Sequence, residues 1–220
     1  MNCGVNSNMF IVDFDDTLFN SFAFKNDRFE AVRQLGVPWE LFLETYWQNR
    51  TNPDGTTSYT NERHAAALAA HGFPEAKIAR AFAESTEPRA LRKYLFPDTM
   101  PFLLFLRSTN RPVVLLSHGD PTFQELKVRG AGLHDLFDRI FFVDGPKAST
   151  VGTLLGEVND RPVWFINDKV GETQEICKEF NELSVVLKQA EQFAEKEYET
   201  SGWPYFKTLH EIQEFLAGKN

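Results

Sequence analysis

Five short apolar segments recur along the chain, and polar or small residues close each one. They are continuous rather than alternating and are rich in β-branched and aromatic residues, which is typical of strands buried on both faces. The segments are MFIV (9–12), PVVLL (112–116), RIFFV (139–143), PVWFI (162–166) and LSVVL (183–187). Helical spacing occupies the intervals at 121–130, 149–158 and 172–181. This alternation predicts an α/β fold, with a Rossmann-like parallel sheet and helices on both faces.

The interval between the first and second segments is too long for a single crossover helix. Residues 20–97 show helical patterns only, and Pro and Gly mark the expected helix ends. The expected helices are 26–35, 38–49, 61–71, 74–85 and 88–95, with a polar loop at 50–60. We therefore predict a core domain made of residues 1–19 and 97–220, and a helical domain, residues 20–96, inserted after the first strand.

The C-terminal part continues the core. Residues 189–200 are polar and rich in glutamate, and SGWPYF (201–206) is a candidate edge strand. Residues 207–217 have the spacing of a final amphipathic helix.

Composition fits a globular chain of 220 residues, with 42% hydrophobic and 25% charged residues. The 21 phenylalanines can supply a large core. The net charge of −8 argues against a nucleic-acid partner, which would require a basic surface. Acidic and basic residues nearly balance over 20–96, so the negative excess lies in the core, and a near-neutral insert is compatible with an anionic substrate.

No apolar stretch approaches the roughly 20 residues of a membrane span, and MNCGVNSN does not resemble a secretory signal. The two cysteines, Cys3 and Cys177, belong to no CxxC or Cys/His cluster, which argues against zinc. We expect a cytoplasmic protein without a membrane partner. The oligomeric state stays open.

Charged and hydroxyl residues follow the predicted strands. They are Asp13 and Asp15 after the first, Ser117 at the end of the second, Lys147 after the third, and Asp168 with Glu172 after the fourth. Ligands of open parallel sheets bind outside the carboxyl ends of the strands. The sequence therefore predicts one site at this edge. Carboxylates as close as those of Asp13, Asp15 and Asp16 repel one another, so they either share a cation or form an exposed acidic turn.

These residues resemble the four motifs of haloacid dehalogenase (HAD) superfamily phosphatases. DFDDTL (13–18) resembles the DxDxT motif, and LLS (115–117) resembles the second motif. Lys147 resembles the third-motif lysine, and IND (166–168) with Glu172 resembles the acidic fourth motif. Order and strand context agree across residues 9–187. The resemblance implies a HAD-like fold in which the insert is a C1-type cap, as found over small-molecule substrates.

The resemblance also implies roles for the residues. Asp13 would attack phosphorus to give an aspartyl-phosphate, and Asp15 would act as general acid and then as general base. The expected phosphate-binding residues are Ser117, Lys147, Thr17 and His118. Mg²⁺ would be held by Asp13, Asp168 and the backbone carbonyl of Asp15, with Glu172 holding a metal-bound water or pairing with Lys147.

Two positions depart from the family pattern. Asn167 stands where the fourth motif usually has glycine, and Glu172 stands where aspartate is frequent. Three other polar residues, Asp120, Gln124 and Lys127, are expected to serve helix capping and the surface.

The predicted function is a Mg²⁺-dependent phosphatase acting on a small-molecule phosphate monoester. Two alternatives stay open. One is a phosphotransferase or sugar-phosphate mutase on the same scaffold, and the other is a non-catalytic phosphate- or metal-binding module. Dehalogenase chemistry is disfavoured because it does not need the acid/base that Asp15 supplies.

Overall fold

The computed structural model describes residues 9–158 and 162–219. Six strands form one parallel sheet in the order β3-β2-β1-β4-β5-β6. The strands are β1 (Met9–Val12), β2 (Val113–His118), β3 (Arg139–Val143), β4 (Val163–Asn167), β5 (Ser184–Lys188) and β6 (Tyr205–Phe206). The central strand, β1, pairs with β2 on one side and β4 on the other. The predicted α/β sheet is confirmed.

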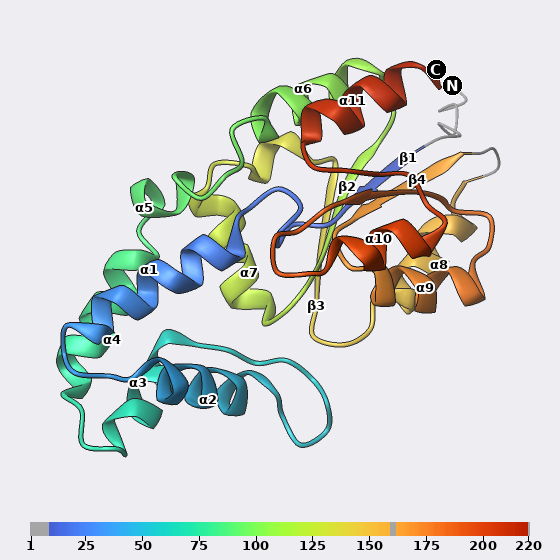
Figure 1. Cartoon of the computed structure of the whole chain (residues 1–220). Coiled ribbons are helices and arrows are strands. Elements are labelled where there is room, and N and C mark those ends of the chain that lie inside the picture. Colours follow the sequence, from blue (N-terminus) through green and yellow to red (C-terminus); the bar gives the residue numbers. More distant parts are fainter. Residues whose placement is uncertain (1–8, 159–161, 220) are drawn as a thin grey trace.

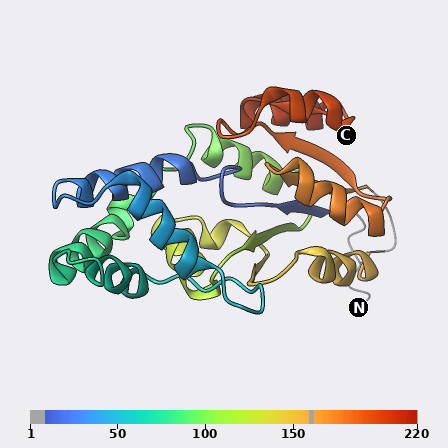
Figure 2. The same ribbon diagram turned by 60° about the horizontal axis from the view of Figure 1, so that its bottom comes forward.

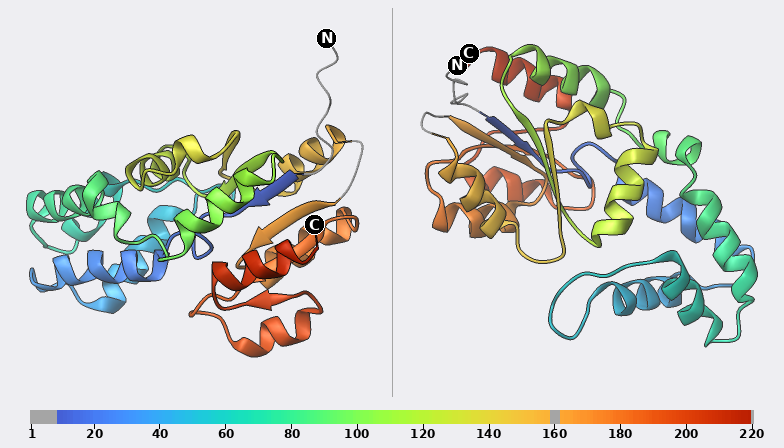
Figure 3. Two further views of the ribbon diagram at one scale, coloured as in Figure 1. Left: turned by 90° about the horizontal axis from the view of Figure 1, so that it is seen from above. Right: turned by 180° about the vertical axis from the view of Figure 1, so that it is seen from behind.

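Helices cover both faces of the sheet, as Figures 1 and 3 show. Successive residues of β1 alternate between two hydrophobic clusters, because side chains along a strand point to opposite faces. Phe10 and Val12 pack with side chains of α6 (Thr99–Ser108), α7 (Pro121–Gly130) and α11 (Leu209–Ala217). Met9 and Ile11 pack with α8 (Ala148–Gly156), α9 (Val170–Glu179) and α10 (Glu195–Ser201).

Six helices lie between β1 and β2, and the first five form what we call the helical insert. They are α1 (Ser21–Arg33), α2 (Trp39–Arg50), α3 (Asn61–Ala69), α4 (Glu75–Ser85) and α5 (Pro88–Arg92). Figure 2 shows the insert extending beyond one end of the sheet. It has its own core, which includes Phe42, Leu68, Ile78 and Phe82. The chain enters and leaves it side by side, because Asn20 N donates to Tyr94 O at 2.7 Å. The domain boundaries at 20 and 96 stay a prediction.

Most elements begin and end close to their predicted bounds, and the differences have local causes. The first helix starts at Ser21 rather than 26 because the Asn20 side chain caps it, accepting from Ala23 N at 2.8 Å. Two helices were not predicted. The sequence of α6, TMPFLLFLRS, is apolar on most sides, and α10, EKEYETS, has Tyr198 as its one large apolar residue. The edge strand near 205 is confirmed. Within the described residues, no helix is long and apolar enough to cross a bilayer.

Candidate active site

Asp13 lies where β1 ends, at the centre of the sheet. Its backbone N–H donates to Ile166 O on β4 at 2.9 Å, which extends the sheet pairing one residue past the strand. The carboxylate is buried and accepts a hydrogen bond from Lys147 Nζ at 2.6 Å. Lys147 is itself buried and also donates to Glu172 Oε2 at 2.8 Å. Burial would lower the pKa of this ammonium, but the two carboxylates raise it above its ordinary value.

Asn167, the departure in the fourth motif, connects this group to α9. Its Nδ2 donates to Glu172 Oε2 and to Thr173 Oγ1, both at 3.0 Å, while its Oδ1 accepts from Lys147 at 3.4 Å. Burial raises the pKa of Glu172, but Lys147, Lys169 and Asn167 outweigh it and lower the pKa to about 2. Of the two expected positions for Glu172, the structure shows pairing with Lys147.

Asp168 is fully buried, and neither of its carboxylate oxygens has a hydrogen-bond partner among the described residues. Burial, followed by repulsion from Asp13, raises its pKa well above the ordinary value. Burial also raises the pKa of Asp13, although Lys147 opposes the shift. The Tyr198 hydroxyl fixes the loop by donating to Asp168 O at 2.7 Å. A buried carboxylate without a partner is destabilising unless a cation neutralises it.

Two predicted hydroxyl residues lie at the same edge of the sheet. Thr17 Oγ1 donates to Asp13 Oδ2 at 3.3 Å, so Thr17 contacts the predicted nucleophile directly. Ser117, on β2, is fully buried, and its hydroxyl has no partner among the described residues. Nearly all buried polar groups are hydrogen-bonded, so this hydroxyl is available to a ligand or a water molecule at the strand end.

Asp15 lies apart from Lys147 and is held by three other side chains. Lys127 Nζ and Ser21 Oγ both approach Oδ1 at 2.5 Å, and Gln124 Nε2 donates to Oδ2 at 2.6 Å. Burial would raise the pKa of Asp15, but the Lys127 charge and these hydrogen bonds hold it well below the usual range. Asp15 is therefore ionised in this arrangement.

The expectation that Gln124 and Lys127 lie at the surface was wrong. Both are buried, because they lie on the face of α7 that also carries Val128. Positions i, i+3 and i+4 share a helix face, and this spacing was the signal that could have identified them. Asp120 does cap α7, accepting from Phe123 N at 2.8 Å, as expected.

His118 joins the core to the loop between α2 and α3. Its Nε2 lies 3.3 Å from Thr57 Oγ1, and Thr57 N donates to Asp144 O at 2.9 Å. His118 also lines a cavity of about 590 Å³ with Lys147, Glu172 and Gly55. The structure places His118 beside Lys147 in the lining of this cavity, and its phosphate-binding role stays a prediction.

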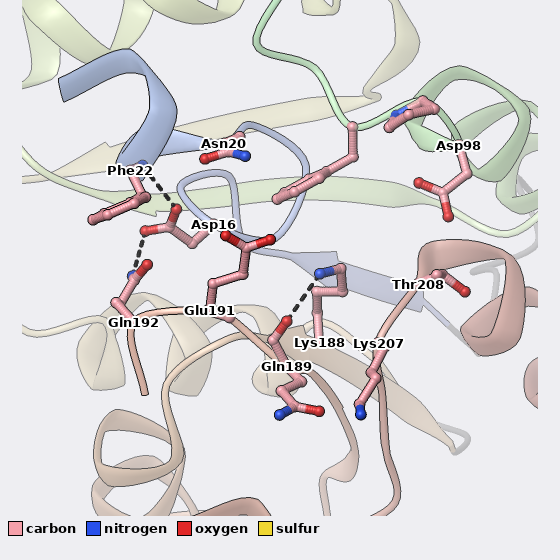
Figure 4. Close-up of a pocket in the computed structure, with 13 residues that line it drawn as sticks. Asp16, Asn20, Phe22, Asp98, Lys188, Gln189, Glu191, Gln192, Lys207 and Thr208 are labelled. Carbon is pink, nitrogen blue, oxygen red and sulfur yellow. Dashed lines mark hydrogen bonds between the residues drawn. The ribbon is translucent and has the colours of Figure 1, made fainter. Parts of the chain in front are cut away.

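Two further cavities adjoin the strand ends. One, of about 380 Å³, lies between Asp15 and helices α1 and α2 of the insert. The other, of about 490 Å³, is shown in Figure 4 and lies beyond Asp16, around Phe96 and Lys188. Asp16 has φ +60°, and its carboxylate accepts a hydrogen bond from Ser21 N, the first residue of α1, at 3.0 Å. Of the three aspartates that follow β1, which are Asp13, Asp15 and Asp16, only Asp16 lines this cavity.

The predicted magnesium site is only partly assembled from side chains. In the described part of the chain, no three His, Cys, Asp or Glu side chains gather as a metal site. Asp13 and Glu172 both pair with Lys147, and Asp15 pairs with Lys127, so Asp168 is the one carboxylate of the predicted metal set without a partner among the described residues. The unpartnered oxygens of Asp168 fit a hard divalent cation, which prefers oxygen ligands and keeps some of its waters.

No protein-family model and no curated protein matches this chain. Solved structures match its fold over nearly the whole length. A haloacid dehalogenase-like hydrolase from Burkholderia xenovorans LB400 is 19% identical, with a TM-score of 0.73 over 97% of this chain and 98% of its own. The HAD-hydrolase YfnB from Bacillus subtilis, solved bound to magnesium, is 14% identical, with a TM-score of 0.60 over 96% and 99%. L-2-haloacid dehalogenase from Xanthobacter autotrophicus is 19% identical, with a TM-score of 0.62 over 96% and 99%. The chain therefore has the fold of the haloacid dehalogenase-like hydrolases.

Proposed function

We propose that the protein is a Mg²⁺-dependent phosphatase that hydrolyses a small-molecule phosphate monoester through an aspartyl-phosphate on Asp13. One observation supports this most. Asp168 presents two buried carboxylate oxygens, and Ser117 a buried hydroxyl, that have no partner among the described residues. A cation would satisfy Asp168, and a phosphoryl oxygen would satisfy the Ser117 hydroxyl.

Asp13 is the nucleophile in this mechanism. One of its carboxylate oxygens bonds to phosphorus while the bond from phosphorus to the leaving oxygen breaks. Lys147 Nζ donates to Asp13 Oδ1 and Thr17 Oγ1 to Oδ2, so the carboxylate is held in one orientation before the attack. Lys147 also supplies positive charge for the phosphoryl oxygens, to which Ser117 donates a hydrogen bond.

Asp15 acts first as the general acid and then as the general base. Its carboxyl group gives a proton to the leaving oxygen, and its carboxylate then takes one from the water that hydrolyses the aspartyl-phosphate. The ionised state that Lys127 maintains suits the second step. The first step needs the protonated carboxyl group, which the pairing with Lys127 disfavours, so this pairing must weaken when the substrate binds.

Mg²⁺ would be held by the carboxylates of Asp13 and Asp168 and the backbone carbonyl of Asp15. When bound, it offsets the negative charge of the phosphate and lets both carboxylates stay ionised in one site. The magnesium-bound structure of YfnB, which has the same fold, is consistent with this. Lys147 and Asn167 keep Glu172 away from direct coordination.

The alternatives fit the site less well. A dehalogenase expels a halide, which needs neither a proton nor a cation to leave. Asp15 would then have no role as a general acid, and the unpartnered Asp168 would have no role as a metal ligand. A mutase must keep water from its aspartyl-phosphate, whereas a cavity of about 590 Å³ adjoins Lys147 here. The helical insert would be the cap that closes over the substrate.

Phosphate release from a panel of phosphomonoesters, including p-nitrophenyl phosphate, tests the proposal with Mg²⁺ and with EDTA. We expect release with Mg²⁺, none with EDTA, and at least a thousandfold loss in Asp13→Asn. Asp135→Asn, at a fully exposed carboxylate, is the matched control and should keep full activity. Unchanged turnover in Asp13→Asn would refute the mechanism. Absence of release from every substrate would favour the binding-module alternative.

A further inference from the structure

The cavity of about 380 Å³ between Asp15 and the insert, which we call the leaving-group pocket, adjoins the site on the side of the predicted acid/base. If Asp15 protonates the leaving oxygen, the rest of the alcohol must lie on this side of the phosphoryl group. The inference below therefore rests on the proposed function. The chemistry of the pocket walls then indicates which alcohol the enzyme accepts.

The pocket walls carry unpaired positive charge. Lys25 and Arg28 on α1 and Arg50 at the end of α2 all line it, and within residues 9–158 and 162–219 none of them forms an ion pair with a carboxylate. Two carboxylates also line the pocket. Asp15 is paired with Lys127, and Asp16 accepts hydrogen bonds from Ser21 N and Gln192 Nε2. Lysines and arginines at the surface of the insert are solvated by water, whereas these three side chains line one cavity.

Arg28 gives the sharpest evidence. Its side chain is only 3% exposed, although a buried charge is normally paired with an opposite one. The guanidinium donates to the neutral oxygens of Tyr59, at 2.5 Å, and Ser85, at 3.0 Å. These bonds use two of its five N–H groups. Among the described residues no carboxylate forms an ion pair with the guanidinium, so its charge has no counterion there.

The remaining walls are aromatic. The Arg28 guanidinium carbon lies 5.6 Å from the ring centre of Tyr59 and 5.9 Å from that of Phe123, and both rings line the pocket. Lys25 Nζ lies over the rings of Tyr46 and Trp47, at 5.4 and 5.5 Å. Aromatic faces hold these cations in place without neutralising them, and they offer flat apolar area to a ligand. The pocket therefore combines net positive charge with planar walls.

The geometry points to a substrate whose alcohol carries a second anionic group, a carboxylate or phosphate, on a flat or apolar frame. The reacting phosphate lies at Asp13, and the second anion occupies the leaving-group pocket beside Arg28, Arg50 and Lys25. The charge pattern excludes cationic alcohols such as amino alcohols, because they would meet these three groups with the same sign.

A matched pair of aryl phosphates tests the second charge. The ester 3-carboxyphenyl phosphate carries it, and 3-carbamoylphenyl phosphate has nearly the same shape without it. We expect kcat/KM at least tenfold higher for the carboxylate, which corresponds to one charged hydrogen bond. The carboxamide group withdraws more electron density from the ring than the carboxylate does, so its phenol is the better leaving group. A higher kcat/KM for the carboxylate ester must therefore come from binding. Equal rates on the two esters would overturn the inference.

Substitutions in the pocket identify the side chains that recognise the second anionic group. Arg50→Gln and Lys25→Gln should each reduce the carboxylate-to-carboxamide ratio of kcat/KM several-fold. Arg80→Gln, at an exposed arginine that pairs with Glu84 on α4, is the matched control and should keep the ratio of the unmodified protein. A ratio that survives in both pocket variants would also overturn the inference. Because Arg28 is buried, its substitution endangers folding, so Arg28 is left intact.

Direct binding separates failure of this inference from failure of the proposed function. Calorimetric titration with 3-hydroxybenzoate and 3-hydroxybenzamide requires no turnover. If no phosphate ester is hydrolysed, the phosphatase proposal fails, but tighter binding of the benzoate that Arg50→Gln abolishes would still support the pocket. Equal binding of both compounds, or none of either, would contradict it.

Discussion

Lys127 Nζ lies 2.5 Å from Asp15 Oδ1, although the two residues are 112 positions apart in the sequence. Both side chains are largely buried, so the pair is screened little by solvent. The lysine comes from the middle of α7, and the carboxylate from the loop after β1. This ion pair fixes the predicted acid/base before any substrate is present.

Replacing Lys127 should impair catalysis more than binding. In Lys127→Met, Asp15 loses its charged partner and its fixed orientation, so we expect kcat to fall about tenfold to a hundredfold with little change in KM. Lys127→Arg keeps the charge and should recover part of the loss. Steady-state kinetics on p-nitrophenyl phosphate measure both. Equal kcat for the methionine and arginine variants would assign Lys127 a packing role only.

Asp168→Asn should stabilise the metal-free protein and abolish its response to Mg²⁺. The carboxylate is buried, unpartnered and repelled by Asp13, so removing its charge relieves a destabilising interaction. We expect the Tm in EDTA to rise by a few degrees, at roughly 2–4 °C per kcal/mol for a chain of this size. Mg²⁺ should raise the Tm of the unmodified protein but not that of the variant.

The control for this experiment is Asp135→Asn, whose carboxylate is fully exposed. It should leave both the Tm in EDTA and the Mg²⁺ response unchanged. A lower Tm for Asp168→Asn in EDTA would mean that the carboxylate is satisfied without a cation, contrary to our description of the site.

Asn167→Ala should loosen the contact between Lys147 and Glu172. The amide donates to Glu172 Oε2 and Thr173 Oγ1, so its loss leaves buried acceptors short of a donor. We expect a loss of about 1–3 kcal/mol in the free energy of unfolding and about a tenfold fall in kcat/KM. Urea denaturation and kinetics measure the two effects. Thr173→Val, which removes only one of these bonds, should lose less activity than Asn167→Ala.

His64 makes the stability of the insert depend on pH. It lies between Thr45 Oγ1 and Tyr59 Oη, each 3.0 Å away. Burial and the charge of Arg28 lower its pKa to about 3, from 6.5. Between these values the unfolded chain binds a proton and the folded chain does not, so stability is complete above pH 6.5 and falls below it.

From pH 7 to pH 5 this one group should remove about 2 kcal/mol from the free energy of unfolding. Urea unfolding at the two pH values measures the loss, and His64→Gln, which cannot titrate, should show a loss smaller by that amount. His210, an exposed histidine, gives the matched control in His210→Gln. Identical pH dependence in all three proteins would show that His64 is accessible to protons.

Much of the core could be predicted from the sequence because parallel strands carry their own signature. The runs before Asp13 and Asp168 are continuous and apolar, and each ends at the residue that the site uses. Position relative to a strand end therefore carried most of the information about Asp13, Ser117, Lys147 and Asp168. The structure brings Asp13 and Lys147 into contact, and it leaves Ser117 and Asp168 buried without partners.

The contacts around Asp15 could not be predicted in the same way, because they depend on helix orientation. Gln124 and Lys127 are polar residues in a polar helix sequence, and only the fold shows that their face is turned inward. Asn167 presents the opposite case. Its departure from the family pattern was visible in the sequence, but its role was not, because its amide connects Glu172 to the site through hydrogen bonds that a glycine could not make.

The loop that joins α2 to α3 separates two openings. Arg50 and Tyr59, at its ends, line the leaving-group pocket, while Gly55, at its tip, lines the cavity beside Lys147. No lining residue is common to both cavities. In a reaction with a covalent intermediate, water must arrive after the bond to the alcohol has broken. In the proposed mechanism this water takes the place of the alcohol beside Asp15, so the alcohol must leave first. The opening at Lys147 offers the phosphate product a route that does not cross the leaving-group pocket.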